Sequence, residues 1–204
     1  MVTVLVAGFG PFPGAPKNPS ADLVRALARR RRPALADVGV VGAVLPTTYA
    51  AIELPALLKR YDPDLVLFFG LATRAKFVRI ESRAVNAASL IHPDAHRQKL
   101  ATRQIICGAP AELKVRASLQ RIAAAIRAAG VTARHSRDAG RYICNAALFT
   151  GLDAARRTGR PKQVAFIHIP SPRTRRPSSR PTAADLVRAA ETALVAFNAA
   201  NKRS

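Results

Sequence analysis

Short apolar runs alternate along the chain with segments in which apolar residues follow helical spacing. The apolar runs are typical of buried β-strands, and they lie at 2–7, 38–45, 65–69, 77–85, 131–135 and 164–169. The segments with helical spacing lie between and after them, at 20–27, 47–60, 119–126, 145–157 and 182–197. Strands that alternate with helices predict an α/β fold, in which helices cover both faces of a largely parallel sheet.

Local residue types set the expected ends of the helices. Ser20 and Thr182 are the expected N-caps of the first and last helices, and Thr182 opens a capping box. Gly130 is expected to end the third helix, and Pro55 to kink or split the second. The stretch 87–115 has no clear period, which predicts a long irregular excursion or a small hairpin.

The chain has 204 residues, enough to bury a core, and 49% of them are hydrophobic, which excludes general disorder. No linker or internal repeat divides the sequence, so residues 1–204 are expected to form a single domain. No apolar run approaches the roughly 20 residues needed to span a bilayer. The first apolar run lacks the basic residues that open a signal peptide, so a cytoplasmic location without membrane contact is expected.

The net charge is +21, from 33 basic and 12 acidic side chains, and arginine outnumbers lysine 26 to 7. Such a field attracts nucleic acid and other anionic partners. The arginines are spread along the chain, however, with short clusters only at 29–32 and 173–176. Aromatic residues do not alternate with them as a base-stacking surface requires. A solvated basic surface is therefore favoured, while nucleic acid stays open as a partner.

Two cysteines and four histidines are candidates for thiol or metal chemistry. Two cysteines exclude a disulfide-rich scaffold, and the scattered histidines give no zinc-binding spacing, so no metal is expected. Cys144 lies in a turn that leads into a predicted helix, where the helix dipole is expected to lower the pKa of its thiol. Cys107 has no such context and is expected to be structural.

A histidine and a glutamate provide the other residue types of a thiol-nucleophile triad. His168 lies near the end of the apolar run 164–169, and strand ends are where open α/β sheets bind ligands. Glu81 is one of four glutamates and ends the run Phe77-Val78-Arg79-Ile80-Glu81, and a carboxylate inside an apolar run needs a partner. Each also has a structural interpretation, as a core histidine and as an ion pair with an arginine. The sequence alone does not bring them together with Cys144.

Several short strings stand in a fixed order between residues 4 and 170. They are Val6-Ala7-Gly8-Phe9-Gly10-Pro11-Phe12 with Asn18-Pro19-Ser20, Leu45-Pro46-Thr47, Pro63-Asp64-Leu65-Val66-Leu67 before Gly70, Glu81 with Ala84-Val85-Asn86, Ala139-Gly140 through Cys144-Asn145, and Ile167-His168-Ile169-Pro170. In this order and spacing, the strings resemble the opening loop and the glutamate, nucleophile and histidine signatures of pyroglutamyl peptidase I, the C15 family of cysteine peptidases.

The resemblance implies a three-layer α/β/α sandwich with a twisted, mostly parallel mixed sheet, of the phosphorylase/hydrolase-like kind. It also implies removal of N-terminal pyroglutamate from peptides. Cys144 would be the nucleophile, His168 the general base and acid, and Glu81 the group that orients the imidazolium. The backbone N–H of Cys144 would donate to the oxyanion. The family uses no metal or organic cofactor and usually forms homotetramers, so a homo-oligomer is expected.

The resemblance further implies an apolar pocket for the pyroglutamyl ring, whose aromatic residues match Phe9, Phe12 and Tyr142. A five-membered lactam is flat, neutral and largely apolar, which suits such a pocket. Simple core packing suits Phe9 and Phe12 equally well. Asn18 ties the opening loop together, contacts the ring or caps the following helix.

Two positions depart from the family pattern. Leu71, at a substrate-binding position, stands where the family typically has glutamine, and Ile91 stands where it has an arginine near the oxyanion. Loss of an oxyanion donor costs about 10²–10³ in rate, unless His92 or Arg83 replaces it. Three functions stay open: a pyroglutamyl peptidase with local compensation, a related hydrolase with altered N-terminal specificity, and an inactive basic paralogue that binds an acidic partner or nucleic acid. Retention of the triad residues favours the enzymes.

Overall fold

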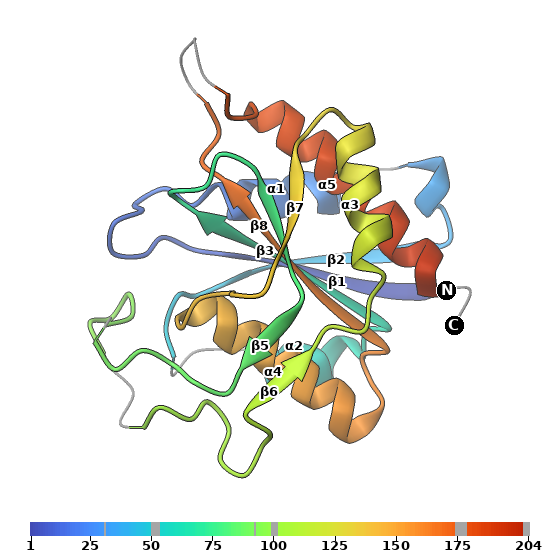
Figure 1. The fold of residues 1–204 in the computed structure, drawn as a ribbon. Coiled ribbons are helices and arrows are strands. Elements are labelled where there is room, and N and C mark those ends of the chain that lie inside the picture. The colour runs from blue at the N-terminus through green and yellow to red at the C-terminus, as the bar shows by residue number, and fades with distance from the viewer. Residues whose placement is uncertain (31, 50–53, 92, 99–101, 174–178, 202–204) are drawn as a thin grey trace.

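Six strands form one sheet in a computed structural model that describes residues 1–30, 32–49, 54–91, 93–98, 102–173 and 179–201 (Figure 1). In sheet order the strands are β2 (Val38–Leu45), β1 (Val2–Phe9), β3 (Leu65–Ala72), β8 (Gln163–Pro170), β4 (Val78–Glu81) and β7 (Ala133–Ser136). Neighbouring strands are parallel except for β4 and β8, which run antiparallel. The predicted mostly parallel mixed sheet is therefore confirmed.

Helices cover both faces of this sheet (Figure 1). One face carries α1 (Pro19–Arg29), α3 (Leu119–Ala128) and α5 (Ala183–Asn201), the other carries α2 (Leu54–Tyr61) and α4 (Ile143–Thr158), and a 3₁₀ helix, η1 (Pro33–Leu35), precedes β2. In β1, Val4 and Val6 pack in the apolar cluster under the first layer, whereas Leu5 and Ala7 pack in the cluster under the second. This alternation is required of a strand buried on both faces, and it gives the predicted three-layer α/β/α sandwich.

The sequence predicts one strand at 77–85, but the structure has two short strands there, and they belong to different sheets. The prediction of a single strand is therefore wrong. After β4 the chain passes Ser82 and continues as β5 (Arg83–Val85), which pairs antiparallel with β6 (Glu112–Lys114). The N–H of Ser82 donates to the carbonyl of Ser136, but the carbonyl of Ser82 accepts from Val115. The ladder therefore changes partners at this one residue, a change that the apolar pattern does not reveal.

The excursion between β5 and β6 is largely irregular, as predicted, and it is held by buried polar side chains. Asn86 donates through Nδ2 to the carbonyl of Ile106 at 2.8 Å, and its Oδ1 accepts from the N–H of Ile105 at 2.9 Å. Asp94 is buried and accepts through Oδ2 from the N–H of Tyr49 at 3.1 Å. The excursion is thereby fixed against the segment that follows β2.

The cap of α1 differs from the prediction. Asn18, not Ser20, is the N-cap: its Oδ1 accepts from the N–H of Ser20 at 3.2 Å. Pro19 occupies the first helical position, where its missing N–H costs nothing and its fixed φ suits the helix. The Asn-Pro pair is therefore the stronger start signal, and Ser20 lies inside the helix.

The starts of α2 and α5 can also be set against the sequence. Residues 47–49 of the predicted second helix are not helical, its residues 50–53 lie outside the described part of the chain, and α2 is described from Leu54 onward, with Pro55 as the next residue. The capping box before α5 is confirmed, because the N–H of Asp185 donates to Oγ1 of Thr182 at 3.1 Å and the N–H of Thr182 to Oδ2 of Asp185 at 2.9 Å. Residues 174–178, which include most of the arginine cluster at 173–176, also lie outside the described part.

Candidate active site

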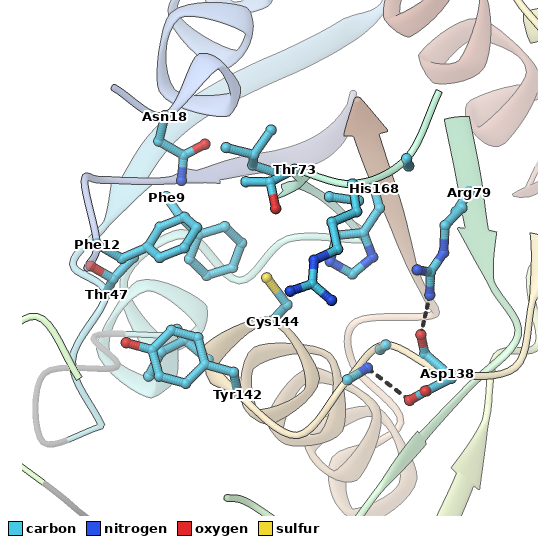
Figure 2. A pocket seen from close by; sticks show the side chains of 17 residues that line it. Phe9, Phe12, Asn18, Thr47, Thr73, Arg79, Asp138, Tyr142, Cys144 and His168 are labelled. Atoms are coloured by element: carbon cyan, nitrogen blue, oxygen red, sulfur yellow. Dashed lines mark hydrogen bonds between the residues drawn. The ribbon is translucent and has the colours of Figure 1, made fainter. Parts of the chain in front are cut away.

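A pocket of about 330 Å³ opens at the carboxyl ends of β1, β3 and β8, beside the first turn of α4 (Figure 2). Seven of the predicted site residues line it: Phe9, Phe12, Asn18, Leu71, Tyr142, Cys144 and His168. The remaining one, Glu81, lies behind His168. Segments distant in sequence thus meet at the edge of the sheet where open α/β folds bind ligands.

His168 and Glu81 come from neighbouring antiparallel strands, β8 and β4. Nδ1 of His168 lies 2.8 Å from Oε1 of Glu81. The carboxylate accepts the Nδ1 proton, which fixes the tautomer and leaves Nε2 as the basic nitrogen of the ring. A histidine held in this way at a pocket wall is suited to take up and return a proton.

Glu81 is fully buried, so its negative charge needs compensation. Arg79 lies two positions earlier, on the same side of β4, and places Nη2 3.2 Å from Oε1 of Glu81. The same guanidinium donates to Oγ of Ser136 at 2.9 Å and to the carbonyl of Asp138. The ion pair with an arginine that was expected for Glu81 is therefore present together with its contact to His168. Arg79 also fixes the loop that leads towards α4.

Cys144 is the second residue of α4 and lies in Figure 2 between the aromatic side chains and His168. Gly70 on β3 permits this close approach, because a Cβ there would come within 3.0 Å of Sγ and 2.7 Å of the Phe166 ring. Burial, followed by the charge of Glu81, raises the pKa of the Cys144 thiol to about 12, against the lowering effect of its backbone N–H. The prediction of a lowered pKa is wrong, because removal from water outweighs the helix terminus.

The first turn of α4 offers hydrogen-bond donors beside the thiol. The first N–H groups of a helix have no partner within the helix. Tyr142, the N-cap residue, makes no side-chain hydrogen bond to them. The N–H of Cys144 therefore belongs to a group of backbone donors that suits a negatively charged oxygen.

One end of the pocket is aromatic. The rings of Phe12 and Tyr142 lie 6.2 Å apart, and Tyr49 meets Tyr142 edge-on at 5.8 Å. The hydroxyl of Tyr142 donates to the carbonyl of Pro93 at 3.0 Å, which anchors this end to the irregular excursion. Burial raises the pKa of Tyr142 and raises that of Tyr49 to about 12, so both phenols stay neutral. This end therefore suits a flat, uncharged group, and Tyr49 is a contributor that the sequence did not single out.

Phe9 and Asn18 line the pocket and also make contacts that hold the fold together. Phe9 is almost fully buried and stacks on Phe166 with ring centroids 6.0 Å apart, so it serves the core and the pocket at once. Asn18 donates through Nδ2 to the carbonyl of Gly10 at 3.0 Å while its Oδ1 caps α1. The loop-tying and capping interpretations of Asn18 are therefore both correct.

The two positions that depart from the family pattern, Leu71 and Ile91, have different surroundings in the structure. Leu71 lines the pocket, but Ile91 is 77% exposed and is not among the lining residues. Arg83, one expected replacement for an arginine there, pairs instead with Glu112 and donates to the carbonyl of Arg137. His92, the other, lies outside the described residues.

Two arginines that the family pattern does not predict, Arg74 and Arg79, also line the pocket. Arg74 follows β3, and Arg79 belongs to β4 and is the partner of His168 in the register of β4 and β8. Neither was singled out from the sequence, because single arginines carry no signal in a chain with 26 of them. The pocket therefore has an aromatic end and a basic end, with Cys144 between them (Figure 2).

The described residues offer neither a metal site nor a membrane-spanning helix. They contain no group of three or more His, Cys, Asp or Glu side chains arranged to hold a metal ion. No helix among them has the length and apolar character needed to cross a membrane.

Comparison with known proteins gives consistent matches. The profile of a family described as pyroglutamyl peptidase matches residues 2–185. The pyrrolidone-carboxylate peptidase of Thermococcus kodakarensis is 32% identical over 169 residues, which cover 82% of this chain and 80% of the relative. Pyrrolidone-carboxylate peptidase 1 of Ralstonia nicotianae is 35% identical over 173 residues, 83% and 79% of the two chains. The solved structure of pyrrolidone carboxyl peptidase from Thermococcus litoralis has a TM-score of 0.91 at 26% identity, covering 100% of this chain and 96% of its own.

Proposed function

Because the chain belongs to the pyroglutamyl peptidase family, we propose that it is a cysteine peptidase that releases N-terminal pyroglutamate from peptides, with Cys144 as its nucleophile. The observation that carries the assignment of residues is the convergence of Cys144, His168 and the buried Glu81 at one pocket. These three groups supply a nucleophile, a base and a carboxylate that orients the base.

In the first half of the reaction, Nε2 of His168 takes the thiol proton as Sγ of Cys144 attacks the pyroglutamyl carbonyl carbon. The N–H groups of the first turn of α4 donate to the oxyanion that forms. The imidazolium then gives its proton to the leaving amine as the C–N bond breaks, which frees the shortened peptide and leaves a thioester. Water, deprotonated by His168, hydrolyses the thioester to free pyroglutamate and restores the thiol.

The resting pair is neutral in this scheme. A thiol with its pKa raised to about 12 keeps its proton at neutral pH, so the nucleophile is generated only as His168 accepts that proton. The carboxylate of Glu81, at 2.8 Å from Nδ1, favours the imidazolium that results. Arg79 shares the same carboxylate and compensates its charge before the proton moves.

The aromatic end supports the choice of acyl group. Phe12 and Tyr142 provide apolar ring faces, and the phenol of Tyr142 stays uncharged because burial raises its pKa. The lactam is flat and carries no charge, since its nitrogen is acylated by its own side chain. A free N-terminal amino acid would bring an ammonium group into this surrounding and lose its hydration without a partner.

A related specificity is the second candidate, and Leu71 is the observation that favours it. The resemblance expects a glutamine there, whereas this chain places the apolar side chain of Leu71 in the lining. An amide would satisfy polar atoms of the lactam that leucine cannot. Cleavage of other N-capped peptides, with none of pyroglutamyl peptides, would identify this alternative.

Two further properties are proposed from the family resemblance. The enzyme assembles as a homotetramer, and the exposed Leu90 and Ile91 provide apolar surface that such contacts cover. It works in the cytoplasm, where a reducing environment keeps the nucleophilic thiol active. Light scattering of the purified protein tests the first property, and cell fractionation tests the second.

The test of the proposed function is release of aminomethylcoumarin from its pyroglutamyl amide under reducing conditions. Cys107 provides a matched control, because it is the other cysteine, is exposed, and is not a lining residue of the pocket. We expect Cys144→Ser to lower kcat/KM by at least about 10³-fold, whereas Cys107→Ser leaves it unchanged. Activity retained in Cys144→Ser, or lost equally in both variants, contradicts the proposal.

A further inference from the structure

A second hollow continues the active-site pocket on its basic side. The two share three lining residues, Arg74, Ala75 and Arg79. Beyond them the second hollow is lined by Lys76, Phe77 and Arg134, among others. We refer to the cationic part of this surface, formed by Arg74, Lys76, Arg79 and Arg134, as the basic groove. It begins at the pocket wall that carries His168.

The basic groove has positive charges without acidic partners. Arg74 and Lys76 are exposed and form no hydrogen bond or ion pair with the described residues. Arg134 lies over the ring of Phe77, with its guanidinium carbon 4.4 Å from the ring centroid. Arg79 is the exception, since it pairs with Glu81. Among the described residues, no aspartate or glutamate lines this second hollow.

Among the described residues, Asp138 is the acidic residue that lines the active-site pocket. Its carboxylate already accepts a hydrogen bond. It lines the active-site pocket but not the second hollow. Its Oδ1 accepts from the N–H of Gly140 at 2.9 Å, as Figure 2 shows. Asp138 therefore fixes the loop before α4, and the free charges of Arg74, Lys76 and Arg134 remain available to a ligand.

The proposed reaction determines which part of a substrate meets this groove. The ring occupies the aromatic end, and His168 gives a proton to the leaving amine. The peptide beyond the scissile bond must therefore leave on the His168 side, where Arg79 is the register partner of His168, and Arg74 lines the same pocket. A pyroglutamyl peptide has no α-ammonium group, so its N-terminus brings no positive charge towards these side chains.

We propose that the basic groove is a subsite for the leaving peptide and that it selects pyroglutamyl peptides with aspartate or glutamate directly after the ring. This inference rests on the proposed function. A peptide fits the groove better than a nucleic acid does, because base stacking needs open aromatic faces and Arg134 covers a face of Phe77. Arg74 is the specificity-determining residue, since it alone of the unpaired cations lines both hollows.

The test compares two peptides, pyroglutamyl-Glu-Glu-Ala-amide and pyroglutamyl-Gln-Gln-Ala-amide, which differ in charge but hardly in shape. Release of pyroglutamate gives kcat/KM for each at about 0.02 M and about 0.5 M salt. We expect the acidic peptide to be favoured about tenfold at low salt, mainly through KM, and the preference to shrink at high salt.

Arg74→Gln removes the charge and, since Arg74 has no described partner, leaves folding intact. We expect the acidic preference to fall to about twofold in this variant. Arg121→Gln is the matched control, because Arg121 is an exposed arginine on α3 that lines neither hollow. It should keep the tenfold preference, since the overall charge of the protein changes equally in both variants.

Three results overturn the inference. A wild-type preference near one, with the coumarin amide still cleaved, removes the subsite but leaves the proposed function intact. An equal loss of preference in both variants assigns the effect to the general field of the protein. Inhibition by a single-stranded oligonucleotide that Arg74→Gln abolishes, beside a peptide preference near one, assigns the groove to nucleic acid. If the coumarin amide and both peptides all resist cleavage, the proposed function fails as well.

Discussion

The aromatic end and the basic end of the pocket differ in how their side chains are held. Tyr142 contacts two other rings and is hydrogen-bonded through its hydroxyl to the backbone of Pro93. Arg74, at the other end, has no described partner at all. A rigid, uncharged surface suits a group that is the same in every substrate. Free, charged side chains suit the part of the substrate that varies.

The catalytic groups lie between the two ends and are supported by the strands. His168 and Glu81 belong to neighbouring strands of the central sheet, and Cys144 to the first turn of the adjoining helix. Changes to these groups should therefore affect every substrate. Changes at the aromatic end should affect binding of the ring, and a change of Arg74 at the basic end only the choice among peptides.

After replacement of the nucleophile itself, the largest effect is expected from Glu81→Gln, which keeps the size of the side chain but removes the charge that favours the imidazolium. We expect kcat on the coumarin amide to fall about 10²–10⁴-fold with little change in KM. Glu112→Gln is the matched control, because Glu112 pairs with Arg83 and is not a lining residue of the pocket. A rise in KM with kcat little changed would assign Glu81 to the shape of the pocket instead.

A smaller effect is expected at the aromatic end from Phe12→Ala. The loss of one ring face should raise KM for the coumarin amide about 10- to 100-fold, since truncation of a buried aromatic contact weakens binding of the apolar ring. Tyr61→Ala removes an aromatic side chain that lies beside Arg60, away from the pocket, and should change neither constant. An unchanged KM in Phe12→Ala would show that the ring binds elsewhere.

The pH dependence of the free thiol gives the third prediction. With its pKa raised to about 12, the thiolate fraction of Cys144 should increase about tenfold for each pH unit between pH 6 and pH 9. Alkylation of Cys144 by iodoacetamide, followed in the Cys107→Ser background, should show this slope. A rate that is level over that range would indicate a preformed thiolate–imidazolium pair and contradict a neutral resting state.

The two ends of the pocket also differ in how far they can be predicted from the sequence. The aromatic end was accessible because Phe9, Phe12 and Tyr142 stand within short strings of recognisable order. The basic end was not, because the position of Arg74 at the pocket wall depends on the turn after β3, which no periodicity fixes. Composition obscured it further, since one arginine among 26 is not distinctive.

The fold was predicted in outline for a similar reason. Buried strands and amphipathic helices have periods that appear in the chain, so the layers and the mostly parallel sheet could be derived. The change of ladder partners at Ser82 could not, because the residues on either side of it, Val78–Glu81 and Arg83–Val85, show no turn residue or break in pattern that separates two strands. The pKa of Cys144 was mispredicted because it depends on burial beside Gly70 and Glu81, which only the folded chain brings together.

The central claim is that Cys144 attacks a carbonyl presented by a ring in the aromatic end. A pyroglutamyl chloromethyl ketone tests it most directly, because the thiol sulfur displaces chloride and leaves a permanent S–C bond whose position peptide mass mapping identifies. We predict one adduct per chain, on Cys144, formed far more slowly in Phe12→Ala. An adduct on Cys107, or full hydrolytic activity in protein that carries the adduct on Cys144, would contradict the claim.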